Sequence, residues 1–436
     1  MTLQAELSTT QELAGVNDLS TFQKNIPLSW IETVLTKTNK ASIRRRKLPA
    51  EQVIWLILGM GLYRNRSITD VVDKLGLVLK DAQDQQIAPS SIVEARMRLG
   101  STPVAELFRL TSHHWYAQDS QDTWQGLQLL GVDGTVFRLQ DSLVNQARFG
   151  YINRPDIPGQ YPFSRLVALM SLRNRLIIDV VFGRSDVGEI PYARELLNTV
   201  PANSLTLLDR CYFSADLLLH WTGNNRHWLT PIKSNIVCHV IKEYAPGDCL
   251  VSMKVSAQAR QKNPELPETW TARRIMYQQT TGEIKGFITS LIDPINYPLK
   301  ELLSVYWERW EIEMGYGEIK QKQLLNEVLL RSQTATGVEQ ELWGILIAYN
   351  LVRLEISQIA REVKKSPLRI SFIMALRFIQ DEFLWCAIAS PGTIPKKLKE
   401  LRANVKQFIL PEKRKRPKPR TVRFSKTRYP VCSTCA

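Results

Sequence analysis

The first quarter of the chain places apolar residues at helical spacing between polar turns. The apolar stretch 50–63 predicts a buried helix. Ser67 with Asp70, and Ser91 with Glu94, predict two further helix starts, because a Ser hydroxyl can accept a hydrogen bond from a first-turn amide. Gly100 is expected to end the second of these helices. We therefore expect residues 1–125 to form an all-α N-terminal domain.

Short apolar runs replace the helical spacing from about residue 126. They predict a strand pair, a hairpin turning at Asn174, and then strands alternating with helices, at 127–132, 136–139, 165–171, 176–182, 205–208 and 227–232. Three antiparallel strands followed by alternating helices and strands predict an α/β fold with a mixed β-sheet.

Polar, proline-containing sequence at about 233–285 interrupts this order. Its apolar runs 249–255 and 269–277 predict a β-rich insertion. Helices resume at Leu299 and continue to about residue 388. We expect one domain over 126–394 that contains the insertion, and a flexible tail over 395–436.

The net charge of +15 is concentrated in that tail. Residues 395–436 hold fourteen basic and two acidic residues, which is +12 of the total. A cationic arm of this kind is suited to a polyanion such as nucleic acid. The six Cys are scattered, as expected of reduced thiols, and Cys432 and Cys435 lack the second ligand pair that a structural zinc site needs.

No stretch of the sequence predicts a membrane span. The longest apolar run, 53–63, is about half the roughly 20 residues that cross a bilayer. With no cleavable N-terminal signal pattern, we expect a cytoplasmic protein with no membrane partner.

Carboxylates are the candidates for chemistry, because the sequence has no phosphate-binding glycine loop and only five His. Asp133 follows the apolar run 127–132, and Asp209 follows 205–208. Two Asp at the ends of neighbouring strands would offer the oxygen ligands that Mg²⁺ or Mn²⁺ prefers. The structural alternatives are a hairpin turn at Asp133-Gly134 and a helix N-cap at Asp209.

A third element carries four polar side chains at fixed spacing. At about 100° per residue these side chains fall within an arc of about 60° on one helix face, and they belong to Tyr306, Arg309, Glu313 and Lys320. A solvent-facing ion pair is the alternative, although the neighbouring Trp307, Trp310 and Ile312 make the segment too apolar for a free surface. The remaining acids of the segment are expected to be solvated, namely Glu308, Glu311 and Glu318.

In these residues the sequence resembles the DDE transposases of the insertion-sequence 4 group, whose signature is Tyr, Arg, Glu and Lys at these spacings. The resemblance covers nearly the whole chain and implies a ribonuclease-H-like core. It further implies that Asp133, Asp209 and Glu313 jointly bind two divalent metal ions, Mg²⁺ or Mn²⁺. Tyr306, Arg309 and Lys320 would then contact phosphates near the cleaved DNA end.

Further DNA contacts are expected from aromatic and basic side chains. Relatives stack an extruded base on an aromatic ring, for which Trp310 and Trp270 are the candidates, although Trp in such positions is more often a core residue than a base platform. In the helical region, Arg96 and Arg98 and the basic run 44–47 suit DNA binding or an ordinary solvated bundle. Lys233 and Asn235 could touch the DNA backbone or lie in a solvated loop.

The activity that the resemblance implies is cut-and-paste transposition of an insertion sequence. It comprises DNA cleavage and strand transfer, with double-stranded terminal inverted repeats and target DNA as partners and a homodimer joining two ends. The protein would be nucleoid-associated when bound to DNA. Two alternatives remain: a non-catalytic, transposase-derived DNA-binding protein, and a metal-dependent nuclease that cuts without joining.

Overall fold

The computed structural model describes most of the chain between residues 25 and 386, namely 25–41, 48–75, 77, 87–119, 122–151, 161–233, 235–278, 284–326 and 329–386, and also 409–410. The basic run 44–47, the CxxC pair and nearly all of the C-terminal tail lie outside these residues. Within them, no helix is long and apolar enough to cross a bilayer.

The N-terminal region is helical, as predicted. Its helices are α3 (Leu28–Lys37), α4 (Ala50–Leu62), α5 (Ile68–Lys74), α6 (Pro89–Leu99) and α7 (Thr102–Asp119). The Ser67 hydroxyl accepts a hydrogen bond from the Asp70 amide at 3.0 Å, which confirms the predicted cap. The predicted start at Ser91 is wrong: α6 begins at Pro89, whose fixed φ suits the first turn of a helix.

A single mixed sheet forms the centre of the molecule. Its strands are β1 (Thr123–Trp124), β2 (Leu127–Arg138), β3 (Phe163–Ser171), β4 (Ile177–Arg184), β5 (Ser204–Leu208), β6 (Arg226–Pro231), β7 (His239–Ala245), β8 (Asp248–Lys254), β9 (Thr269–Gln278) and β10 (Ile284–Thr289). The order β4-β3-β2-β5-β6 has antiparallel β2, β3 and β4 followed by parallel β5 and β6. This is the predicted α/β, ribonuclease-H-like core.

Strand β2 corrects one sequence expectation. The sequence predicts two strands with a possible turn at Asp133-Gly134, but β2 runs unbroken from Leu127 to Arg138. Every residue from Leu130 to Arg138 is paired with β3, so Asp133 lies inside the strand, opposite Ala168.

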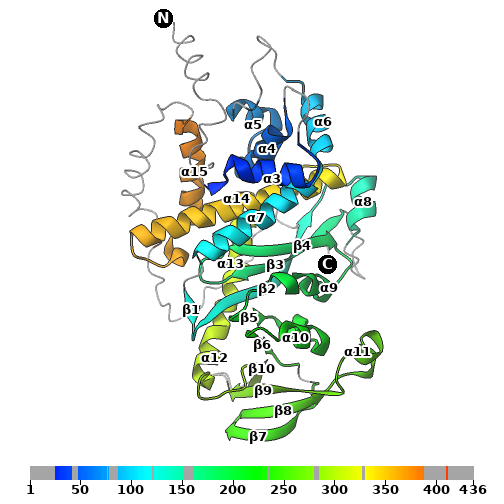
Figure 1. Ribbon diagram of the computed structural model, residues 1–436, viewed down its shortest axis with the longest axis vertical. Coiled ribbons are helices and arrows are strands. Elements are labelled where there is room, and N and C mark those ends of the chain that lie inside the picture. Colours follow the sequence, from blue (N-terminus) through cyan, green and yellow to red (C-terminus); the bar gives the residue numbers. More distant parts are fainter. Residues whose placement is uncertain are drawn as a thin grey trace, which may run out of the picture.

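The β-rich insertion continues the same sheet. Strand β10 pairs antiparallel with β6, and β9, β8 and β7 follow in order to the sheet edge. A short helix, α11 (Ala257–Lys262), joins β8 to β9. Figure 1 shows these strands at the opposite end of the molecule from the N-terminal helices.

Helices flank the sheet and complete the chain. Helices α8 (Leu143–Phe149), α9 (Glu189–Glu195) and α10 (Ala215–Trp221) come from the connections between core strands. The segment with the four-residue pattern comprises α12 (Leu299–Tyr306), the 3₁₀ turn η4 (Trp307–Arg309), α13 (Trp310–Gly317) and the π-helical η5 (Glu318–Gln323). We call residues 299–323 the signature helix.

Helix α14 (Ala335–Glu362) joins the helical region to the sheet. It runs beside α4 and α7, and α15 (Phe372–Cys386) packs on it (Figure 1). A Cβ added at Gly61 would lie 2.6 Å from the Gly344 carbonyl oxygen, so α4 and α14 approach at backbone distance. The buried apolar side chains of the helices and the sheet form one continuous core.

Candidate active site

Asp133 lies in β2, and Asp209 directly follows the adjacent parallel strand β5. Val132 of β2 is the register partner of Leu208, the last residue of β5, so each Asp comes one residue after this pair. Asp209 also caps the 3₁₀ turn η3 (Arg210–Tyr212), accepting a hydrogen bond from the Arg210 amide at 2.6 Å. Asp209 is therefore the cap that the structural alternative predicted, and it also lies next to Asp133.

The signature helix brings Glu313 to the same place. Helix α13 packs on β2, where the Tyr316 hydroxyl donates to the Asp133 carbonyl oxygen at 2.6 Å. A Cβ added at Gly131 would lie 3.5 Å from Cβ of Ile312, which shows how closely helix and strand approach. Glu313 Oε1 accepts a hydrogen bond from Arg309 Nη2 at 2.7 Å.

Tyr306 and Arg309 lie beside the carboxylates, whereas Lys320 of η5 lies against β2 farther from them. The buried Tyr306 donates its hydroxyl hydrogen to the Leu208 carbonyl oxygen, directly before Asp209, at 3.3 Å. Lys320 Nζ lies 5.4 Å from the ring centre of Phe137, four residues beyond Asp133. The assumption of a uniform 100° per residue is wrong here, because the segment tightens at η4 and widens at η5.

The electrostatics join these groups into one site. The pKa of Asp133 is raised to about 6, mainly by burial and to a smaller extent by the nearby carboxylates of Glu189 and Glu313, against the lowering effects of the Gly134 amide and Arg309. Burial lowers the pKa of Arg309, but Tyr306, Glu313 and Asp209 together raise it above its ordinary value. Each group thus responds to the charges of the others.

The residues fit divalent metal ions by donor chemistry and charge. All three predicted ligands are carboxylates, whose oxygens are the donors that Mg²⁺ and Mn²⁺ prefer, and a dication would offset the cost of burying the Asp133 charge. Among the described residues, no three acidic, His or Cys side chains already point at one ion position. Glu313, held by Arg309, and Asp209, held by the Arg210 amide, would have to turn toward a metal.

A fourth carboxylate, Glu189, was missed by the sequence analysis. It is the first residue of α9 and lies against Gly134 of β2: a Cβ added to that glycine would be 2.5 and 2.6 Å from the two Glu189 carboxylate oxygens. The Asp133-Gly134 pair, which suggests a turn, therefore marks a close approach.

The two tryptophans considered for base stacking differ in solvent exposure. Trp310 is 51% exposed, with the Arg309 guanidinium 5.7 Å from its ring centre, so its face is accessible beside the site. Trp270 is 5% exposed and packs against Phe213 and Trp228. The structure makes Trp270 a core residue and excludes it as an accessible base platform.

The other acids of the signature helix are not solvated charges, contrary to expectation. Glu318 is buried and pairs with Arg175 Nη1 at 2.5 Å, and Glu311 accepts a hydrogen bond from Arg175 Nε at 2.8 Å. Glu308 pairs with Arg173 at 2.8 Å. These pairs fasten the helix to the turn between β3 and β4.

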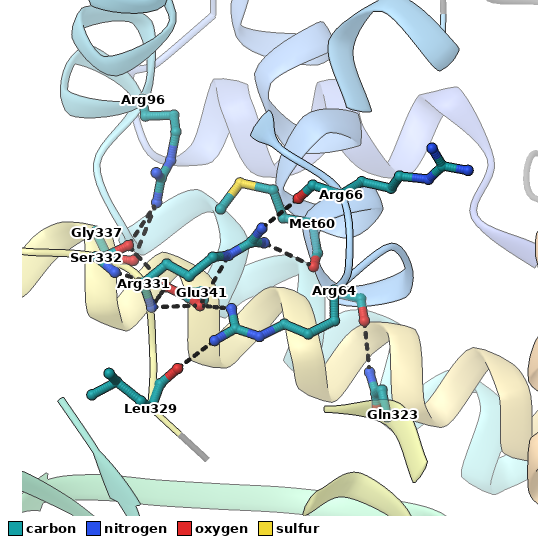
Figure 2. A network of polar contacts seen from close by, with 11 residues as sticks. Met60, Arg64, Arg66, Arg96, Gln323, Leu329, Arg331, Ser332, Gly337 and Glu341 are labelled. Atoms are coloured by element: carbon teal, nitrogen blue, oxygen red, sulfur yellow. Dashed lines mark hydrogen bonds and ion pairs between the residues drawn. The ribbon is translucent and has the colours of Figure 1, made fainter. Parts of the chain in front are cut away.

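Arg96 corrects another expectation. Its side chain is buried and donates to Gln340 Oε1 at 3.1 Å and to the Gly337 carbonyl oxygen at 3.2 Å, so it holds α14 and is not available to DNA. Figure 2 shows it beside a network in which Glu341 accepts from Arg64 and from the Ser332 amide. Arg98 is exposed, and its DNA contact stays a prediction.

The loop after β6 holds the last two candidates for contact with the DNA backbone, and their surroundings differ. Lys233 Nζ donates to the Phe213 carbonyl oxygen at 3.1 Å, which ties the loop to the core, while Asn235 is exposed.

Comparison with known proteins gives two family matches. Residues 16–109 match the model described as insertion element 4 transposase N-terminal, and residues 124–351 match the transposase DDE domain. The transposase InsG for insertion sequence element IS4 of Escherichia coli (strain K12) is 34% identical over 418 residues, which cover 95% of this chain and 94% of that protein.

Among solved structures, a piggyBac transposase synaptic complex with hairpin DNA is similar. The match covers 92% of this chain and 87% of that chain, with a TM-score of 0.42 and 15% sequence identity. A similarity of this size supports no conclusion about this chain.

Proposed function

Since the chain belongs to the insertion-sequence 4 family of DDE transposases, we propose that Asp133, Asp209 and Glu313 are the catalytic carboxylates of this transposase. The observation that carries the proposal is the parallel register of Val132 with Leu208, which makes the two Asp neighbours, together with the packing of α13 on β2 beside them. Three carboxylates from three neighbouring segments could then turn toward one position at which a DNA phosphodiester can react.

The three carboxylates would hold two divalent ions, Mg²⁺ or Mn²⁺. Bound there, such ions supply activation of the attacking oxygen and stabilisation of the leaving oxygen in an in-line displacement. Asp133 would offer its oxygens from β2 and Asp209 from the end of the neighbouring strand β5, and Glu313 would complete the set from α13.

Arg309 has two roles in this scheme. In the structure it holds Glu313 at 2.7 Å. If Glu313 held a metal ion, the Arg309 guanidinium would be free to bind a phosphate with two parallel hydrogen bonds. Tyr306 and Lys320 would add contacts to the same DNA end, with Lys320 acting as a point charge, and the exposed Trp310 could stack an extruded base.

The remainder of the proposal concerns DNA binding. The N-terminal helices, with Arg98 and the basic run 44–47, would recognise the terminal inverted repeats, and the basic tail would add salt-dependent phosphate affinity. Two copies of the chain would join two ends before insertion into target DNA by cut-and-paste transposition, and the DNA-bound protein would be nucleoid-associated.

A cleavage and joining assay tests this proposal. Purified protein, Mg²⁺ or Mn²⁺ and DNA with the element's own ends are compared for the wild type, Asp133→Ala, Asp209→Ala and Glu313→Ala. We expect cleavage to fall about 1000-fold or more in each variant, with end binding retained, because the loss of several kcal/mol of transition-state stabilisation has this effect.

Glu339→Ala is the matched control, since Glu339 is also paired with an arginine, Arg148, at 3.1 Å but lies outside the site. It should cut at the wild-type rate. Wild-type protein that binds the ends but cuts with neither ion would favour the non-catalytic DNA-binding alternative. Cleavage without a joined product would favour the nuclease.

A further inference from the structure

Glu189 reaches the site from an element that carries none of the signature residues. Helix α9 connects β4 to β5 and packs against β2, β3 and η3. Figure 1 shows it beside the core strands at the level of β2. Its first residue is Glu189, and Gly188 stands at the N-cap position. The side chain projects onto β2 at Gly134, the position directly after Asp133.

Glu189 contacts two elements, β3 beside Asp133 and the η3 turn that begins at Asp209. Its Oε1 accepts from Arg165 Nη1 of β3 at 2.9 Å, and its Oε2 accepts from the Tyr212 hydroxyl at 2.8 Å. Tyr212 is fully buried and ends η3, the turn that Asp209 caps. One carboxylate thus joins the strand beside Asp133 to the turn that begins at Asp209.

Charge gives Glu189 a second effect. Arg165 is its one ion-pair partner among the described residues, and the Glu189 side chain remains 24% exposed. Its negative charge lies directly beside Asp133, since a Cβ built at the next residue, Gly134, would be 2.5 and 2.6 Å from the two Glu189 carboxylate oxygens. Because opposite charges attract, a cation held by Asp133 would also be stabilised by this second carboxylate.

We propose that Glu189 is a fourth acidic residue of the metal site: it strengthens divalent ion binding by the three catalytic carboxylates and holds the Tyr212 turn that positions Asp209. The inference rests on the proposed function, because it assumes that the three carboxylates bind the ions. Glu189 is a positioning residue, acting through Asp133 and Tyr212.

Mn²⁺ binding to the full-length protein without DNA tests the inference apart from activity. Calorimetric titration compares the wild type, Glu189→Gln, Glu189→Asp and Asp133→Asn. Gln keeps a carbonyl oxygen for Tyr212 but removes the charge, so we expect about 10-fold weaker binding, the size typical of residues around metal ligands. Asp restores the charge and should recover part of the affinity, whereas Asp133→Asn should lose binding outright.

Glu339→Gln is the control, because Glu339 is an arginine-paired acid with a side chain 20% exposed, comparable to Glu189, and it should bind Mn²⁺ as the wild type does. Should Glu189→Gln misfold, as judged by circular dichroism, Gly134→Ala keeps the test open, since its methyl group displaces the Glu189 carboxylate and should weaken binding similarly.

Two results would overturn the inference, and they differ. Wild-type affinity in Glu189→Gln, or in Gly134→Ala, with binding lost in Asp133→Asn, would refute the role of Glu189 and leave the proposed function standing. Wild-type affinity in Asp133→Asn would refute the proposed metal site, and with it the inference.

Discussion

At the scale of single residues, the partly buried carboxylate of Asp133 costs the fold stability when it is ionised. Asp133 lies inside a core strand, and burial with two neighbouring carboxylates raises its pKa to about 6. Its folded-state pKa thus exceeds the unfolded value of 3.8, so the folded protein binds more protons between these values. Stability contributed by this group is highest below about pH 4 and falls as the pH rises through about 6.

Asp133→Asn should therefore stabilise the metal-free fold while abolishing cleavage. With EDTA at pH 7 the substitution removes a charge that costs on the order of 1 to 2 kcal/mol, allowing for partial exposure. We expect a higher Tm by a degree or more at pH 7 and little difference near pH 4, measured by scanning fluorimetry. A lower Tm than the wild type at pH 7 would show that the Asp133 charge is not a cost to the fold.

At the same scale, the sequence could identify the three carboxylates that we propose as catalytic, but not Glu189 beside them. Asp133, Asp209 and Glu313 each stand in a local pattern, namely a strand followed by Asp or a helical spacing. Glu189 stands in no such pattern, and its position depends on how α9 packs against β2. The one local signal is Gly134, which a sequence reader assigns first to a turn.

At the scale of elements, buried ion pairs determine where the signature helix lies. Arg175, in the turn after β3 with φ of 58°, binds Glu311 and Glu318, and Glu318 also lies 3.5 Å from Arg353 of α14. The period of apolar residues predicted the helix, but its 3₁₀ and π turns and these partners were not predictable. The partners are distant in the sequence, and charge at helical spacing is more often solvated.

Glu318→Ala and Glu308→Ala compare a buried with a half-exposed pair on this helix. Removing Glu318 leaves two buried guanidinium groups without their shared carboxylate, which typically costs about 3 to 5 kcal/mol. Removing Glu308, whose pair with Arg173 is about 30% exposed, should cost about 1 kcal/mol or less. Thermal melts should show a drop of several degrees for the first and a small one for the second; equal drops would refute this account of the helix.

At the scale of the whole molecule, the helical N-terminal region and the sheet share one core. Gly61 and Gly344 let α4 and α14 meet at backbone distance, and Gln323, at the end of the signature helix, donates to the Gly61 carbonyl oxygen at 3.1 Å. The network around Glu341 joins Arg64, after α4, to the chain that leads into α14 (Figure 2). The sequence predicted both regions but not that they share one core. Apolar periodicity shows which face of a helix is buried, but not which element covers that face.

Because the two regions share one core, we expect that neither the N-terminal helical region nor the sheet region folds alone. A fragment of residues 122–436 would expose the α14 surface that α4 and α7 cover, so we expect it to be insoluble or to bind a hydrophobic dye without a cooperative melt. Residues 1–119 should behave likewise. Co-expression of the two fragments is the control, and it should restore a soluble complex with a cooperative transition, since the contacts between them need no covalent link. A cooperative melt of the 122–436 fragment alone would show instead that the N-terminal helices are an appended module that the sheet does not need in order to fold.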